Sequence, residues 1–136
     1  ISDRRRAEEA LAQEGLNGRR HHRPDTLSGG AQQRVAIARA LAANPAVLLA
    51  DEPTGNLDSQ NTVAICRILR DLNERQRRTI VIVTHEPLVA MWAKRAVVLH
   101  DGAILADFPV GSFADGHELA AHYQELLAGQ IPALPN

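Results

Sequence analysis

Two short runs of apolar, mostly branched residues stand in the middle of the chain, AVLLA at 46–50 and TIVIVT at 79–84. The stretch between them, from about 59 to 75, has the composition of a helix. A strand, a helix and a strand in this order predict a parallel pair of strands. Because both runs are apolar at nearly every position, we expect central strands that helices cover on both faces.

The residues before the first run predict two helices. Ser2 or Asp3 can cap a helix that continues to about Glu14, and a basic, turn-rich loop at 16–26 follows it. A second helix is predicted from Gly30 to about residue 43, where an Asn-Pro pair stops it.

The residues after the second run predict a hairpin and a last helix. The segments AVVLH and AILAD flank Asp101-Gly102, which is a typical two-residue turn of a β-hairpin. The tail from about Phe113 to Gly129 is predicted to be helical.

Composition narrows the class of protein. The formal net charge is -1, from 15 basic and 16 acidic residues, so binding to nucleic acid through bulk charge is not expected. Cys66 is the only cysteine, which excludes a disulfide framework inside the chain and indicates the cytosolic side of a cell. The first residue is Ile1, and the sequence opens as if within an element, so we expect a fragment.

The first apolar run ends in two adjacent carboxylates, in VLLADEP at 47–53. Ligands collect at the carboxyl ends of parallel strands, so Asp51 and Glu52 stand where a site would form. A bare Asp-Glu pair is more often a solvated acidic turn. After a buried strand, however, the pair suits a nucleotide hydrolase, in which one carboxylate holds Mg²⁺ through water and the other activates the attacking water.

His85 follows the second apolar run directly, in THEP. A histidine at this edge of the sheet can hydrogen-bond a phosphate oxygen or the attacking water. A lone histidine at this position more often has only a structural role at the end of the strand. The same structural interpretation applies to the five other histidines, His21, His22, His100, His117 and His122.

The segment LSGGAQQR, at 27–34, stands at the start of the second predicted helix. Ser28 is a good N-cap residue, and Gly29 and Gly30 lack the Cβ atoms that would hold a ligand away. The free N–H groups and the helix dipole make this start a candidate anion site. An ordinary capped helix would show the same three residues.

Four motifs occur together in the order and spacing of an ATP-binding cassette (ABC) ATPase, which the chain resembles over about residues 23–102. LSGGAQQ is similar to the signature motif of that family, VLLADE to its Walker B strand, GNLD at 55–58 to its D-loop, and His85 to its switch histidine. The resemblance implies that Glu52 and His85 are catalytic and that Asp51 holds Mg²⁺. It also implies that Ser28, Gly29, Gly30 and Gln32 contact an ATP molecule held by a second subunit, and that Asp58 reaches across the dimer interface.

The phosphate-binding loop of the family is missing from the sequence. That loop has the pattern G-x-x-x-x-G-K-[ST], and the only lysine, Lys94, has no suitable glycines before it. The expected fold is therefore α/β, a partial P-loop NTPase-like domain with a parallel β core, flanking helices and a C-terminal β-hairpin, and without its Walker A half. The resemblance divides the chain into the end of a helical subdomain with a loop at 1–26, the ATPase core at 27–112, and a C-terminal helix and tail at 113–136.

The resemblance implies an ATP-binding subunit of a transporter. Its motif sequences are most similar to those of the lipoprotein-release and macrolide-export subgroup. The full-length form would hydrolyse ATP to drive a membrane permease, pair with a second nucleotide-binding domain and lie on the inner face of the cell membrane. The fragment alone is expected to be inactive. Two alternatives remain: a soluble ABC ATPase of DNA repair or translation, and a non-hydrolytic regulatory module.

Overall fold

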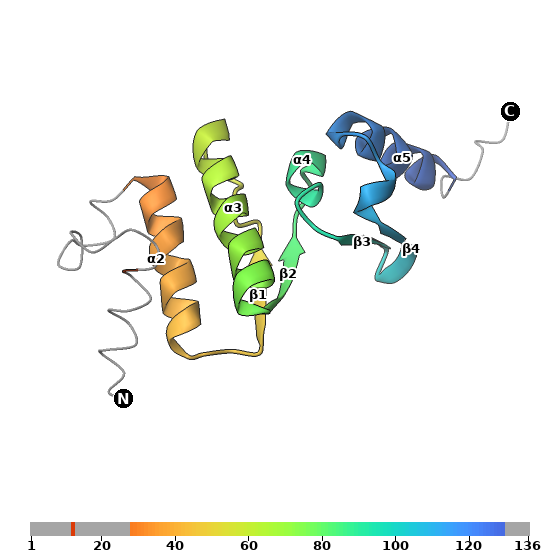
Figure 1. Ribbon diagram of the computed structural model, residues 1–136. Coiled ribbons are helices and arrows are strands. Elements are labelled where there is room, and N and C mark those ends of the chain that lie inside the picture. Colours follow the sequence, from red (N-terminus) through yellow and green to blue (C-terminus); the bar gives the residue numbers. More distant parts are fainter. Residues whose placement is uncertain (1–11, 13–27, 130–136) are drawn as a thin grey trace, which may run out of the picture. The chain divides into compact units, whose positions relative to one another are not determined.

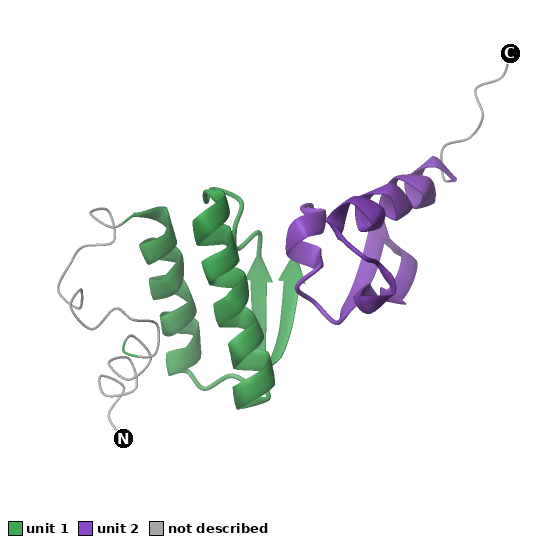
Figure 2. Cartoon of the chain, turned by 45° about the horizontal axis from the view of Figure 1, so that its top comes forward, with its two compact units in different colours: residues 1–83 green, residues 84–136 purple. Residues whose placement is uncertain are grey.

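The computed structural model describes residue 12 and residues 28–129, which form two compact units divided between Val83 and Thr84 (Figure 2). The helix predicted at 2–14 and the loop at 16–26 lie outside the described residues, except for Ala12, which is helical. No helix among the described residues is long and apolar enough to cross a membrane.

Over residues 28–83, the first unit contains two strands and two helices (Figure 1). In chain order they are α2 (Gly29–Ala42), β1 (Val47–Asp51), α3 (Ser59–Gln76) and β2 (Thr79–Val83). The strands pair in parallel, from Val47 opposite Thr79 to Asp51 opposite Val83, and α3 is the crossover between them. The predicted parallel pair of strands is confirmed, as are the helices predicted from Gly30 to about 43 and from about 59 to 75.

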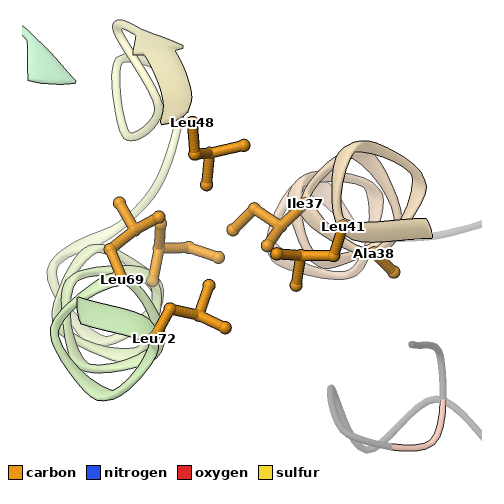
Figure 3. Packing of buried hydrophobic residues seen from close by; sticks show 7 residues of the cluster. Ile37, Ala38, Leu41, Leu48, Leu69 and Leu72 are labelled. Atoms are coloured by element: carbon orange, nitrogen blue, oxygen red, sulfur yellow. The ribbon is translucent and has the colours of Figure 1, made fainter. Parts of the chain in front are cut away.

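Both helices pack against one face of this two-stranded sheet. Figure 3 shows Leu48 of β1 directed toward Ile37 and Leu41 of α2 and toward Leu69 and Leu72 of α3. Ile80 and Ile82 of β2 pack against the same cluster. Burial of these branched side chains contributes roughly 1.5–3 kcal/mol for each residue, so this cluster is what holds the two helices to the sheet.

The opposite face of the sheet is open among the described residues. Side chains alternate along a strand, and the exposed fractions on this face are 47% for Val47, 76% for Leu49, 46% for Val81 and 57% for Val83. The expectation of helices on both faces is therefore wrong for the described residues, because α2 and α3 both lie on the same side.

One arginine joins the two turns that enter the strands. Arg78, which precedes β2, donates hydrogen bonds to the Pro45 carbonyl at 2.5 Å and to Asn44 Oδ1 at 2.6 Å. Asn44 and Arg77 both have positive φ, 50° and 53°, which lets each helix end sharply. The clamp fixes the amino ends of β1 and β2 beside each other.

The second unit consists of a hairpin and helices. Its elements are α4 (Pro87–Ala90), β3 (Arg95–His100), β4 (Ala103–Pro109), a 3₁₀ turn (Val110–Ser112) and α5 (Gly116–Ala128). The strands pair antiparallel, and Asp101 and Gly102 both have positive φ, 47° and 77°, as a type I′ turn requires. The predicted hairpin is confirmed, whereas α4 was not predicted.

The last helix begins later than its sequence suggests. Asp115 is the N-cap of α5, and its Oδ1 accepts the N–H groups of His117 at 2.8 Å and of Glu118 at 3.0 Å. Phe113 instead packs edge-on against Phe108, at 5.3 Å between ring centroids. Because the capping aspartate comes after the aromatic residue, the helix begins at Gly116 rather than at Phe113.

The two faces of β1 predict different effects of truncation. Leu48→Ala leaves a cavity between the helices and is expected to lower the free energy of unfolding of this chain by about 2–5 kcal/mol. Leu49→Ala, on the open face, should change it by less than about 0.5 kcal/mol. Urea unfolding followed by circular dichroism measures both, and equal effects would contradict the one-sided core.

Candidate functional site

The first turns of α2 and α3 lie against each other. A Cβ atom added to Gly29 would stand 3.2 Å from Cδ2 of Leu57, and one added to Gly30 would stand 2.2 Å from Oδ1 of Asn61. Two helix starts, each with a partial positive charge, therefore meet at one place in the first unit. The Ser-Gly-Gly turn and the GNLD segment that the sequence singled out separately are brought together.

Ser28 occupies the N-cap position of α2 as predicted. Its backbone is extended, with φ -61° and ψ 156°, and its carbonyl accepts the first helical hydrogen bond from the N–H of Gln32 at 2.9 Å. Its side chain makes no capping hydrogen bond, so the predicted role of the hydroxyl as a helix cap is wrong. Ser28 and Gly29 are exposed, while Gly30 is buried.

Asp58 is the N-cap of α3, and both of its carboxylate oxygens are bound. Oδ1 accepts the N–H of Asn61 at 2.9 Å, and Oδ2 accepts the side-chain Nδ2 of the same residue at 2.8 Å. Hydrogen bonds donated to a carboxylate favour its charged form. The backbone and side-chain donors of Asn61 accordingly hold the pKa of Asp58 below its ordinary value of 3.8.

Asp51 and Glu52 lie at the carboxyl end of β1. Asp51 is exposed and pairs with the last residue of β2. Glu52 leaves the sheet with a φ of 42°, while its N–H still donates to the Val83 carbonyl at 2.8 Å. A left-handed backbone at a non-glycine residue costs on the order of 1 kcal/mol or more and is concentrated at functional sites.

A short loop joins these carboxylates to α3. Gly55 donates its N–H to the Glu52 carbonyl at 3.2 Å, and Leu57 donates to the Thr54 carbonyl at 3.0 Å. Thr54 is only 2% exposed. Two backbone hydrogen bonds thus hold the loop between Glu52 and Leu57, directly before the N-cap of α3.

The chemistry of the donors at this end of the sheet suits a cation that keeps most of its waters. No group of three or more His, Cys, Asp and Glu side chains able to hold a metal occurs in the described part of the chain. Mg²⁺ commonly binds through one or two carboxylates together with water and substrate phosphates. Asp51 fits that requirement.

His85 belongs to the second unit. It is exposed and stands between β2 and α4, in a segment where the N–H of Glu86 donates to Oγ1 of Thr84 at 3.1 Å. In the first unit, the structure brings the Ser28, Gly29 and Gly30 turn close to Asp58. Asp51 and Glu52 lie at the other end of the loop that joins β1 to α3. The catalytic role of His85, at the same edge of the sheet as Asp51, stays a prediction.

Asn61 was not singled out in the sequence, although it contacts both Asp58 and Gly30. A polar residue three positions after a helix N-cap is a known capping pattern, and Asn61 stands three positions after Asp58. Its contact with Gly30 leaves no such trace, because the two residues are far apart in the chain.

Comparisons with known proteins agree with the motifs. A family model described as ABC transporter matches residues 2–55. The macrolide export ATP-binding/permease protein MacB of Chlorobium luteolum is 54% identical over 104 residues, which are 76% of this chain and 16% of that protein. The protein of the same name from Escherichia coli is 54% identical over 106 residues, 78% of this chain and 16% of that protein.

A solved structure gives the same result for the fold. The dimeric ATP-binding cassette MJ0796, in a post-hydrolysis state with ADP and phosphate, is similar with a TM-score of 0.68 and 46% identity. The match covers 79% of this chain and 47% of that one. The chain thus spans about a sixth of the curated relatives and about half of the solved cassette.

The bonds to Asp58 predict a dependence of stability on acid. Because its pKa is lower in the folded state, Asp58 stabilises the fold above about pH 3.8, and this contribution is lost as the pH falls through the folded-state pKa. Asp58→Asn can still cap α3 but cannot titrate, so its free energy of unfolding should fall less steeply in acid. Urea unfolding from pH 6 to pH 2 measures this.

Gln60→Ala, at an exposed neutral residue in the same turn, is the matched control and should keep the slope of the unmodified chain. Identical slopes for the unmodified chain and Asp58→Asn would show that the carboxylate contributes nothing to the acid dependence.

Proposed function

The chain belongs to the ATP-binding cassette family of transporter ATPases, and from this membership we propose that the whole protein hydrolyses ATP to drive a membrane permease. The described residues supply part of that machinery: the catalytic carboxylates for one nucleotide and the lid for another. The chain by itself is expected to be inactive, because its sequence contains no phosphate-binding loop.

The observation that carries the proposal is the arrangement of Asp51 and Glu52 at the carboxyl end of β1. Glu52 leaves the strand with a left-handed backbone directly after Asp51, and its N–H anchors the turn to β2. Two carboxylates in such positions can take two roles. We assign Asp51 to the cation and Glu52 to the attacking water, which it orients and deprotonates.

Mg²⁺ is the cation that this assignment implies. It would be held by Asp51 through water and by the phosphates of ATP, and when bound it would neutralise charge on the phosphates. We assign His85 to the same nucleotide, as a hydrogen-bond donor to the phosphate that is transferred.

The paired helix starts serve a different nucleotide, held by a second cassette. Ser28 and Gly29 are exposed at the start of α2, where N–H groups and the helix dipole favour a phosphate. Gln32 is exposed one turn later and is assigned to the same ligand. Asp58, at the adjoining start of α3, is assigned to contact across the interface. The dimeric state of the similar solved cassette supports this arrangement.

The partners follow from the same relatives. Identity of 54% to proteins named for both ATP binding and a permease supports a membrane permease as the partner and a position on the inner face of the membrane. It favours transport over the alternatives of DNA repair, translation or a non-hydrolytic module. The assignment of 1–26 to a helical subdomain, 27–112 to the ATPase core and 113–136 to a C-terminal helix and tail is part of this proposal.

Replacement of Glu52 is the direct test of hydrolysis. In the full-length protein, Glu52→Gln should still bind ATP but release phosphate about 10²–10⁴-fold more slowly, since the group that activates water is gone. The ATP-bound dimer should then accumulate. Steady-state phosphate release and size-exclusion chromatography with Mg-ATP measure the two effects.

Glu74→Gln, an exposed carboxylate on α3, is the matched control and should hydrolyse ATP at the rate of the unmodified protein. Normal phosphate release by Glu52→Gln would overturn the assignment of Glu52.

A bulky residue at Gly29 tests action on a second subunit. Gly29→Leu should block approach to the partner's nucleotide and reduce ATP-dependent dimerisation at least about tenfold, while the ATP affinity of the monomer stays within about twofold. Gly29→Ala should be milder, because its Cβ would meet the flexible end of Leu57 at 3.2 Å and the Asn56 carbonyl at an ordinary contact distance of 3.8 Å. Dimerisation is measured in the Glu52→Gln background by analytical ultracentrifugation. A collapse of monomer affinity would contradict action in trans.

A further inference from the structure

Asn61 has an unusual position, since one side chain contacts both loops that the proposed function assigns to the dimer interface. It lies in the first turn of α3, and its two donors occupy both carboxylate oxygens of Asp58, at 2.9 and 2.8 Å. Asn61 therefore holds both oxygens of the Asp58 carboxylate, through its backbone and its amide together.

The same amide fills the space beside Gly30. A Cβ atom at Gly30 would stand 2.2 Å from Oδ1, 2.7 Å from Cγ and 3.2 Å from Cβ of Asn61. Separations below 3.0 Å require something to move. The amide can move away only by rotating or withdrawing Nδ2, which is the atom that binds Asp58.

Gly29 provides the contrast within the same turn. Its added Cβ would meet Cδ2 of Leu57 at 3.2 Å, and the end of a leucine side chain can shift without breaking a hydrogen bond. A side chain added at position 30 therefore has to displace the Asn61 amide, whereas one added at position 29 does not.

We propose that Asn61 is a positioning residue that couples the Ser-Gly-Gly turn of α2 to the carboxylate of Asp58. The inference rests on the proposed function, which assigns both groups to the closed dimer. A displacement of the turn at Gly30 pushes the Asn61 amide and so weakens its hydrogen bond to Oδ2 of Asp58, while that hydrogen bond in turn holds the amide beside Gly30. A change in the position of either loop therefore affects the other.

A double-mutant cycle in the full-length protein tests the coupling. The variants are Gly30→Ala, Asn61→Ala and the two combined, and the measurements are kcat and KM for ATP. Each single change should lower kcat roughly tenfold with KM nearly unchanged, because the nucleotide is held elsewhere. The double variant should be no slower than the slower single variant, since Asn61→Ala removes the group that the new Cβ strikes.

Asn61→Asp separates shape from hydrogen bonding. It keeps the oxygen beside Gly30 but replaces the donor to Asp58 by a second carboxylate oxygen, and so it should lower kcat at least as much as Asn61→Ala. Gln60→Ala, an exposed residue in the same turn, is the control and should leave kcat and KM unchanged.

Two results would overturn the inference alone. In the first, the unmodified protein hydrolyses ATP, but the fold-loss in kcat of the double variant equals the product of the losses of the two single variants. The other is an Asn61→Asp variant with unmodified kcat. Absence of hydrolysis by the unmodified protein would instead overturn the proposed function, so the two failures are told apart in the same experiment.

Discussion

The parallel pairing of β1 and β2 is the constraint on which the rest of the first unit depends. Parallel strands cannot be joined by a tight turn, so the chain must cross from one end of the sheet to the other, and α3 makes that crossing. The carboxyl end of β1 is then followed at once by the loop that leads to α3. For this reason Asp51, Glu52 and Asp58 occur on one short segment, and the clamp of Arg78 on Asn44 and Pro45 keeps the opposite ends of both strands in place.

Much of this arrangement is readable from the sequence. The apolar runs at 46–50 and 79–84, the helix between them and the Asp101-Gly102 turn all depend on local patterns that few other structures share, and each is confirmed. The resemblance to the cassette family, carried by four spaced motifs, is confirmed by the comparisons. The start of α5 is placed three residues too early, because helix propensity does not reveal that Asp115 is the residue whose side chain caps.

The parts of the site that the sequence does not reveal depend on contacts between distant segments. The packing of Asn61 against Gly30 joins two helices across 31 positions in the chain, and no periodic pattern records it. The left-handed backbone at Glu52 is likewise not revealed: Pro53 indicates that the strand ends here, but glutamate rarely adopts a positive φ. Ser28 has the residue type and position of a capping serine, yet its side chain makes no capping bond. Residue type predicts what a group can do, while packing decides what it does.

The open face of the sheet gives the pattern of the first apolar run a further meaning. Val47, Leu49, Val81 and Val83 are between 46% and 76% exposed, although branched apolar residues in adjacent strands normally lie against other side chains. The apolar residues at nearly every position of both strands predict burial on both faces. Among the described residues, however, only one face is covered. The similar solved cassette is about twice as long as the region matched here, which is enough chain to cover a second face. The open face thus carries a row of exposed branched apolar residues on the two strands whose carboxyl ends lie next to Asp51 and Glu52.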